Sequence, residues 1–172
     1  FNRFWDNLNK ILEKCPRVNT TIMSTYNALS VPSYKKLLDG VYGLKKTYGS
    51  DDRYWNSAVF LDASYLRYPT HQTVQILPQK WSNEILQQAQ YADYLGVPLF
   101  DTKHIGYSDI EIQKLKRIFD WMISADDKTA INRQRYNFGK FFKEHDIRRG
   151  TNFKETFPEF AEFYDDCQRI KL

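Results

Sequence analysis

The sequence contains very little cysteine: Cys15 and Cys167 are the only thiols among 172 residues, and about 150 residues separate them. Two cysteines this far apart have neither the spacing of a zinc or iron–sulfur site nor the number that a disulfide framework needs. We therefore predict that this chain alone holds no metal. Isolated thiols are typical of a reducing compartment, which indicates a cytoplasmic protein.

Long apolar runs are also missing. The longest apolar stretches, such as residues 57–61, are far shorter than the roughly 20 residues that cross a bilayer, and no charged-then-apolar leader opens the sequence. We expect a soluble protein without membrane contact. The sequence has no glycine-rich phosphate loop, nucleophile elbow or His-Glu-x-x-His motif, so no motif identifies a catalytic residue.

Hydrophobic periodicity in the first eighty residues alternates between helix and strand. Apolar residues recur at helical spacing over 1–15, a β-branched alternation covers 18–25, and a second helix is predicted over 33–49. Two extended runs follow at 57–63 and 72–77. This order predicts an α/β fold with parallel strands, in which the functional residues lie beyond the carboxyl ends of the strands.

The sequence becomes helical after Pro78. Ser108 and Glu111 have the spacing of a capping box, in which each side chain accepts a hydrogen bond from the other residue's backbone N–H. We therefore predict an α/β portion over 1–80 and a helical C-terminal region over 81–172. The helices predicted in the second region cover residues 82–95, 108–122, 131–144 and 156–170.

Several phrases of the sequence are typical of one enzyme family. They are residues 4–16, 20–31, 37–45, 66–78 and 144–158, the last of which begins Glu144-His-Asp-Ile-Arg-Arg-Gly-Thr-Asn-Phe153. The first three resemble the closing helix–strand–helix segment of radical S-adenosylmethionine enzymes. The last two resemble a twitch-domain-containing branch, some of whose members are phage-encoded. The resemblance implies the C-terminal part of a partial parallel (β/α) barrel followed by a helical annex.

The resemblance also implies a cofactor site. In this family S-adenosylmethionine lies across the strand ends of the barrel, and polar side chains of the later strands help to hold it. By position, Thr25 and Asn27 at one strand end and Gln75 on the final strand would bind it. The residues themselves leave an alternative open, in which Asn27 begins a turn and Thr25 packs.

The family's reaction needs a four-iron, four-sulfur cluster, held by three cysteines in a Cys-x-x-x-Cys-x-x-Cys triplet. No such triplet occurs in this sequence. The resemblance therefore implies that the cluster belongs to a missing N-terminal half or to a partner chain, or that the activity has been lost. In each case this chain alone is expected to be inactive. The helical pattern already under way at Phe1 agrees with a beginning in mid-fold.

Three further polar residues are candidates for substrate or anion binding. His71 stands in a proline-containing turn before the last predicted strand, where it either faces a pocket or has a structural or solvated role, whereas His104 lies in a linker. Arg148 and Arg149 follow a predicted helix, where they either gather carboxylates from the acidic last helix or bind an anionic substrate.

Two other functions stay open. The chain is alternatively a non-catalytic protein-binding or assembly module, which uses its aromatic helices and Arg148–Arg149.

The third possibility is a single-stranded nucleic-acid-binding module, because seven Lys or Arg residues and two acids lie between Arg133 and Lys154. Here we expect the phenylalanines on one side of a helix and the bases on the other, as in an ordinary amphipathic helix. That arrangement, with a pI of 8.9, does not favour nucleic acid as a partner.

Overall fold

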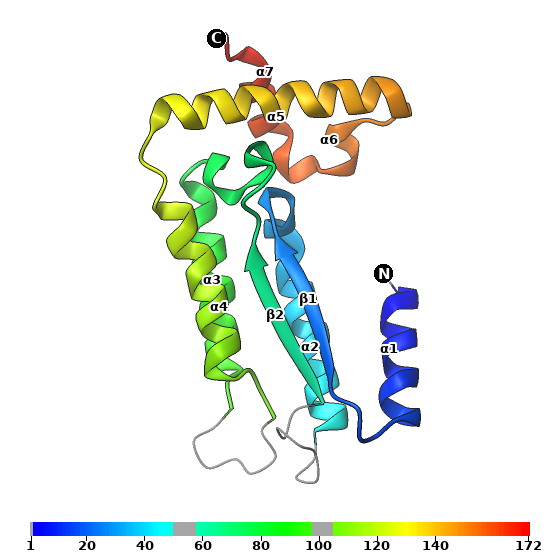
Figure 1. Ribbon diagram of the computed structural model, residues 1–172. Helices are drawn as coiled ribbons and strands as arrows, with labels where there is room; N and C mark the ends of the chain where they lie inside the picture. Colours follow the sequence, from blue (N-terminus) through cyan, green and yellow to red (C-terminus); the bar gives the residue numbers. More distant parts are fainter. Residues whose placement is uncertain (1, 50–57, 98–104) are drawn as a thin grey trace. The chain divides into compact units, whose positions relative to one another are not determined.

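The computed structural model describes residues 2–49, 58–97 and 105–172 (Figure 1). Phe1, residue 57 and His104 lie outside the described residues. The elements are α1 (Asn2–Lys14), β1 (Thr20–Tyr26), η1 (Ala28–Ser33), α2 (Tyr34–Tyr48), β2 (Val59–Tyr65), η2 (Thr70–Gln72), η3 (Val74–Ile76), α3 (Lys80–Tyr94), α4 (Asp109–Ile123), α5 (Lys128–Arg149), α6 (Phe153–Thr156), η4 (Pro158–Phe160) and α7 (Ala161–Arg169), where η marks a short 3-10 helix.

The chain is a mixed α/β protein, and β1 and β2 pair as a parallel sheet. At the start of the sheet Thr20 N donates to Ala58 O at 3.0 Å, and at its end Leu66 N donates to Tyr26 O at 2.8 Å. The pairing therefore advances in the same direction along both strands. The predicted order of helix, strand, helix and strand is confirmed through β2.

The contacts of the chain divide it into two compact units, and each is described by itself. Unit 1 comprises Phe1–Ser24, Ser33–Ser64 and Leu86–Arg117, and unit 2 comprises Thr25–Pro32, Tyr65–Ile85 and Ile118–Leu172. Both strands and the helices α3 and α4 contribute residues to each unit. The division of the sequence after residue 80 stays a prediction.

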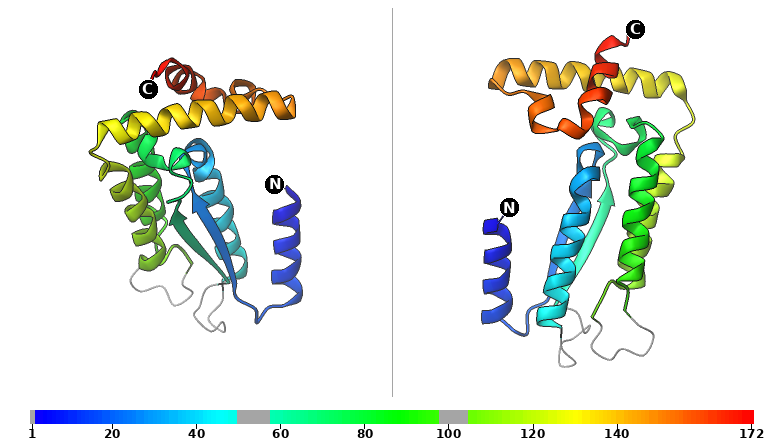
Figure 2. Two further views of the ribbon diagram at one scale, coloured as in Figure 1. Left: turned by 45° about the horizontal axis from the view of Figure 1, so that its top comes forward. Right: turned by 180° about the vertical axis from the view of Figure 1, so that it is seen from behind.

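Unit 1 packs α1 alongside α2, as both views in Figure 2 show. Leu8 and Leu12 lie one helical turn apart on α1 and are buried. Gly40 allows α2 to come close to α1, because a Cβ atom at that position would lie 2.5 Å from the Trp5 ring. A larger side chain at Gly40 therefore requires the Trp5 ring or the helices to move.

Unit 2 has an aromatic core built by α5, α6 and α7. Phe138 and Phe142 are one turn apart on α5 and are both buried, with ring centroids 4.7 Å apart. Phe153 of α6 lies 4.6 Å from Phe142, and Phe163 of α7 lies 5.3 Å from Phe138. Tilted and edge-to-face ring pairs each add about 0.5–1.5 kcal/mol beyond the burial of their area.

Helix α5 is longer than the predicted range 131–144. The Asp127 side chain caps its N-terminus by accepting hydrogen bonds from Thr129 N at 2.9 Å and Ala130 N at 3.0 Å. Gly150 ends it at φ 62°, a left-handed conformation that favours glycine. The 22 residues of α5 are rich in charge, and no helix among the described residues is both long and apolar enough to cross a membrane.

The predicted strand over 72–77 is wrong, because this segment forms the two short 3-10 helices η2 and η3. Its backbone hydrogen bonds are local: Thr73 N donates to Thr70 O, and Leu77 N donates to Val74 O. The Thr73 hydroxyl also donates to Thr70 O at 3.0 Å. The local hydrogen bonds satisfy backbone groups of this segment, in which Val74 and Ile76 are buried.

The two thiols differ in their surroundings, and we expect this difference to decide their reactivity. Cys15 is exposed, whereas Cys167 on α7 is 1% exposed and burial raises its pKa to about 12. A disulfide reagent such as DTNB should therefore label Cys15 quickly at pH 8 and Cys167 only after unfolding. Cys15→Ser should abolish the fast reaction, and Cys167→Ser should leave it intact. Fast labelling of Cys167 in the native protein would contradict this structure of unit 2.

The same thiol predicts a loss of stability in alkali. Folded Cys167 keeps its proton up to about pH 12, whereas the unfolded chain releases it near the ordinary thiol pKa of about 8.5. Ionisation above that pH thus favours the unfolded state, so the free energy of unfolding should fall as pH rises from 8 to 10. Urea titrations at both pH values measure the fall, and Cys167→Ala should make it smaller.

Candidate functional site

Many of the residues 144–158, which carry part of the family resemblance, form the turn between α5 and α6. The Asp146 carboxylate accepts hydrogen bonds from the Thr151 hydroxyl and from Phe153 N, each at 2.8 Å. The Asn152 side chain accepts a hydrogen bond from Lys154 N at 3.1 Å and so caps α6. These polar residues therefore have structural roles in closing one helix and starting the next.

Arg148 and Arg149, by contrast, are exposed on the last turn of α5. They line a shallow hollow of about 640 Å³, together with Asn137, Lys140, Phe141, Glu144 and His145 from the same helix. The Arg148 side chain is 78% exposed, and its Nε lies 3.9 Å from the Glu144 carboxylate. Both predicted anion-binding arginines thus lie in one hollow, and their role there stays a prediction.

The alternative in which these arginines gather carboxylates from the last helix is wrong. Asp165 of α7 pairs with Lys154, and Glu162 lies 2.7 Å from Lys80 Nζ. Asp166 pairs with Arg169 of its own helix at 3.2 Å. The acidic side chains of α7 thus have other cationic partners.

The expectation for the phenylalanines is also wrong at one position. Phe138 and Phe142 are buried, but Phe141 is 42% exposed and lines the hollow with the basic residues. His71 of η2 lies against this ring, with centroids 5.1 Å apart. Burial lowers the pKa of His71, and its buried Nε2 has no hydrogen-bond partner among the described residues. His71 thus contacts Phe141, which lines the same hollow as Arg148 and Arg149, and its role in binding stays a prediction.

The predicted cofactor residues occupy different local settings in unit 2. Thr25 is exposed near the end of β1. Asn27 begins a turn, because its Oδ1 accepts a hydrogen bond from Leu29 N at 2.9 Å and its N donates to the Ser30 hydroxyl at 3.2 Å. The alternative to cofactor binding was that Asn27 begins a turn and Thr25 packs. The turn at Asn27 is confirmed, and the packing of Thr25 is wrong.

Gln75 lies in the 3-10 helix η3 rather than on a strand. Its Nε2 donates hydrogen bonds to Trp121 O at 2.9 Å and to the Ser124 hydroxyl at 3.3 Å. The side chain thus joins η3 to the end of α4. This structural role accounts for the amide nitrogen, and cofactor binding by Gln75 stays a prediction.

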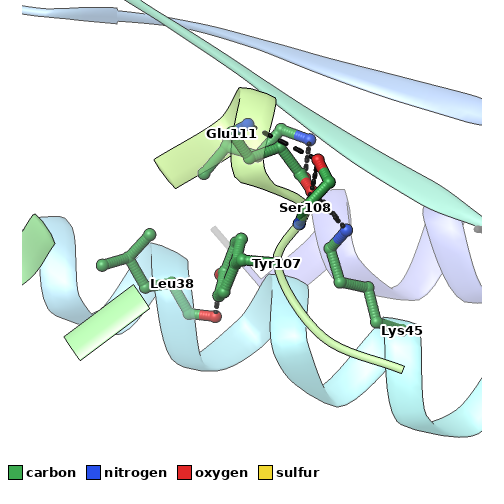
Figure 3. Close-up of polar contacts among 6 residues, drawn as sticks. Leu38, Lys45, Tyr107, Ser108 and Glu111 are labelled. Atoms are coloured by element: carbon green, nitrogen blue, oxygen red, sulfur yellow. Dashed lines mark hydrogen bonds and ion pairs between the residues drawn. The ribbon is translucent and has the colours of Figure 1, made fainter. Parts of the chain in front are cut away.

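Unit 1 contains a buried ion pair (Figure 3). Lys45 of α2 and Glu111 of α4 are 2% and 1% exposed, and Lys45 Nζ lies 2.9 Å from Glu111 Oε1 and 3.0 Å from Oε2. Leu61 N of β2 donates to Oε1 at 2.7 Å. One carboxylate therefore joins two helices and a strand.

The same carboxylate completes the predicted capping box, which is confirmed. Ser108 N and the Ser108 hydroxyl each donate to Glu111 Oε2 at 2.8 Å, and Glu111 N donates weakly to the hydroxyl oxygen at 3.4 Å. Next to the box, the Tyr107 hydroxyl donates to Leu38 O at 2.7 Å, and burial raises the pKa of Tyr107. These contacts hold the start of α4 against α2 (Figure 3).

A cavity of about 360 Å³ adjoins this ion pair. It is lined by Asn19, Thr20, Thr21, Lys45, Phe60, Val97, Gly106, Ser108, Ile110 and Glu111. Burial lowers the pKa of Lys45, and the nearby Glu111 charge opposes that shift. Both Glu111 oxygens already accept hydrogen bonds from structural donors, so the pair serves to hold the fold.

Sequence reasoning missed Lys45 as a buried residue. A signal was present: Lys45 follows Val41 by four residues and Leu38 by seven, which places it on the apolar face of its helix. Its partner stands 66 residues away. A pairing over that separation is not visible in local periodicity.

The described residues do not fit an iron–sulfur cluster. Cys15 belongs to unit 1 and Cys167 to unit 2. Among residues 2–49, 58–97 and 105–172, no three His, Cys, Asp or Glu side chains lie close enough to hold a metal ion. No chemical step through a cluster is therefore assigned to these residues.

Removing one partner of the buried pair should be strongly destabilising. Lys45→Met leaves the Glu111 charge buried, which typically costs about 3–5 kcal/mol in the free energy of unfolding. The matched control is Lys36→Met on the exposed side of the same helix, for which a change within about 0.5 kcal/mol is expected. Urea or thermal unfolding measures both.

A double-mutant cycle distinguishes the ion pair from mere packing. Glu111→Gln keeps an oxygen for the capping box but removes the charge, so Lys45→Met combined with Glu111→Gln should be less destabilised than the sum of the two single variants. Simple additivity would show that Lys45 and Glu111 do not stabilise each other.

Comparison with known proteins provides no family assignment. No protein-family model matches the chain, and no curated protein or solved structure matches it either. The functional argument therefore rests on the residues of this chain and on their geometry.

Proposed function

We propose that this chain is the C-terminal portion of a radical S-adenosylmethionine enzyme of the twitch-domain type. In this proposal it forms part of the wall of the cofactor and substrate pocket, within a partial parallel (β/α) barrel. The observation that carries the proposal is the parallel β1–α2–β2 unit with polar residues at the carboxyl end of β1. Strand, helix and parallel strand form the repeating unit of such barrels.

Two side chains at that strand end have groups suited to a polar ligand. The Thr25 hydroxyl is exposed, and Asn27 uses its Oδ1 for the turn while its Nδ2 is the donor we assign to the cofactor. Thr25 lies near the carboxyl end of β1 and Asn27 follows that end directly, the edge at which ligands of parallel α/β folds bind. Their proposed role is to bind and orient S-adenosylmethionine.

The electron that cleaves the cofactor must come from a cluster outside these residues. When bound in the complete enzyme, a four-iron, four-sulfur cluster supplies that electron, and Cys15 and Cys167 do not provide its ligands. The proposal therefore assigns the cluster to an N-terminal half or a partner chain. This chain alone should neither hold iron nor cleave the cofactor.

The test is cofactor binding by the anaerobically purified polypeptide or complex that contains this chain. We expect Thr25→Val and Asn27→Asp each to weaken S-adenosylmethionine binding about five- to twentyfold, the loss of one hydrogen bond to a charged or polar ligand. Asn27→Asp retains the oxygen that accepts from Leu29 N, so the turn is preserved. Equilibrium dialysis measures the affinity, and reductive cleavage of the cofactor measures the activity.

The matched control is Thr21→Val, which makes the same change at an exposed position near the other end of β1. It should leave cofactor affinity unchanged. Absence of cofactor binding in the wild-type protein, or equal losses at Thr21 and Thr25, would overturn the proposal. A protein partner bound without iron or cofactor would instead favour an assembly module.

A further inference from the structure

Positive charge is concentrated on one helix. Helix α5 contains seven Lys or Arg residues and two acids, a net of +5. The whole chain carries +4, so all other residues together carry 4 − 5 = −1. The basic character of this protein therefore resides in α5.

The inner and outer faces of α5 use their cations differently. Arg135 faces inward, where its Nε donates to Ile76 O at 2.6 Å. The exposed cations of α5 are Lys128, Arg133, Lys140, Lys143, Arg148 and Arg149. With a rise of 1.5 Å per residue, Arg133 and Arg148 stand about 22 Å apart along the helix axis. At 3.6 residues per turn, Arg133, Lys140 and Arg148 lie on one side of α5, and Arg149 extends from its last turn. The outer face thus carries a basic strip along which a polymeric ligand can lie.

An aromatic ring lies within this strip. Phe141 is 42% exposed and lines the hollow of about 640 Å³ with Lys140, Arg148 and Arg149. Glu144 also lines it, and its weak pairing with Arg148 neutralises only part of the charge. An exposed ring among cations combines a stacking surface with phosphate-binding groups, the two elements that single-stranded nucleic acid requires.

We propose that the outer face of α5 binds single-stranded nucleic acid, with phosphates at Lys140, Arg148 and Arg149 and a base stacked on Phe141. The inference is independent of the proposed enzymatic role. The acidic side chains of a peptide would satisfy the cations but provide no aromatic ring to stack on Phe141. Duplex nucleic acid would hide its base faces from the ring, so the structure favours a single strand.

The test uses the full chain and fluorescently labelled twelve-nucleotide oligouridine, followed by fluorescence anisotropy at several salt concentrations. We expect binding that weakens steeply as salt increases. Arg148→Gln combined with Arg149→Gln should weaken binding at least tenfold and reduce the steepness of the salt dependence by about 1.4, since each single-strand phosphate contact contributes about 0.7.

Phe141→Ala should weaken binding about tenfold and leave the salt dependence unchanged, because stacking releases no counterions. The matched control is Arg3→Gln combined with Arg17→Gln, which removes the same charge from exposed positions in unit 1 and should have little effect. Circular dichroism and thermal unfolding verify that each variant is folded. If Phe141→Ala does not fold, the arginine pair still decides the result.

Several outcomes would overturn the proposal. These are undetectable binding at 50 mM salt, equal losses in the control and arginine variants, or equal affinity for duplex and single strand with no effect of Phe141→Ala. Displacement of the oligonucleotide by polyglutamate at equal charge concentration would identify the strip as a site for acidic protein segments instead.

Discussion

Unit 1 depends on one buried carboxylate. Glu111 accepts the Lys45 ammonium of α2, the backbone N–H of Leu61 in β2 and both donors of Ser108 at the start of its own helix. Burying a charge is costly unless it is paired and hydrogen-bonded, and here each oxygen has at least two donors. The position of α4 against α2 and β2 therefore follows from the need to satisfy this charge. Lys45, Ser108 and Glu111 also line the cavity beside this pair.

Local patterns in the sequence predicted local structure well. The alternation at residues 18–25 and the helical spacing that follows identified β1 and α2, because each pattern matches the period of its element. The capping box at Ser108 was visible for the same reason. The strand prediction for 72–77 was wrong because a short apolar run fits both a strand and successive 3-10 turns. Local hydrogen bonds to Thr70 favour the 3-10 turns. The Lys45–Glu111 pair was not found from the sequence because its members are far apart along the chain.

The candidate sites illustrate the difference between a residue type and its surroundings. Asn27 and Gln75 are polar residues at plausible positions, yet the Asn27 side-chain oxygen and the Gln75 amide nitrogen already serve a turn and a helix end. Arg148 and Arg149 were chosen for their charge, and the acids expected to neutralise them are paired elsewhere. Helical periodicity also placed Phe141 with its buried neighbours, although it lies at the border between the two faces. Such border positions are where amphipathic patterns are least informative.

The direction of α5 affects what its last turn can hold. A helix C-terminus carries partial negative charge from its unpaired carbonyl groups, and Arg148 and Arg149 lie on that turn. The helix dipole therefore stabilises these cations in the free protein and opposes a small anion that approaches the carbonyl groups. A compact ion such as inorganic phosphate gains little there. A longer ligand can contact the arginine side chains away from the helix axis and extend toward the middle of α5, where the dipole has faded. The polarity of the helix thus favours extended polyanions over small ones.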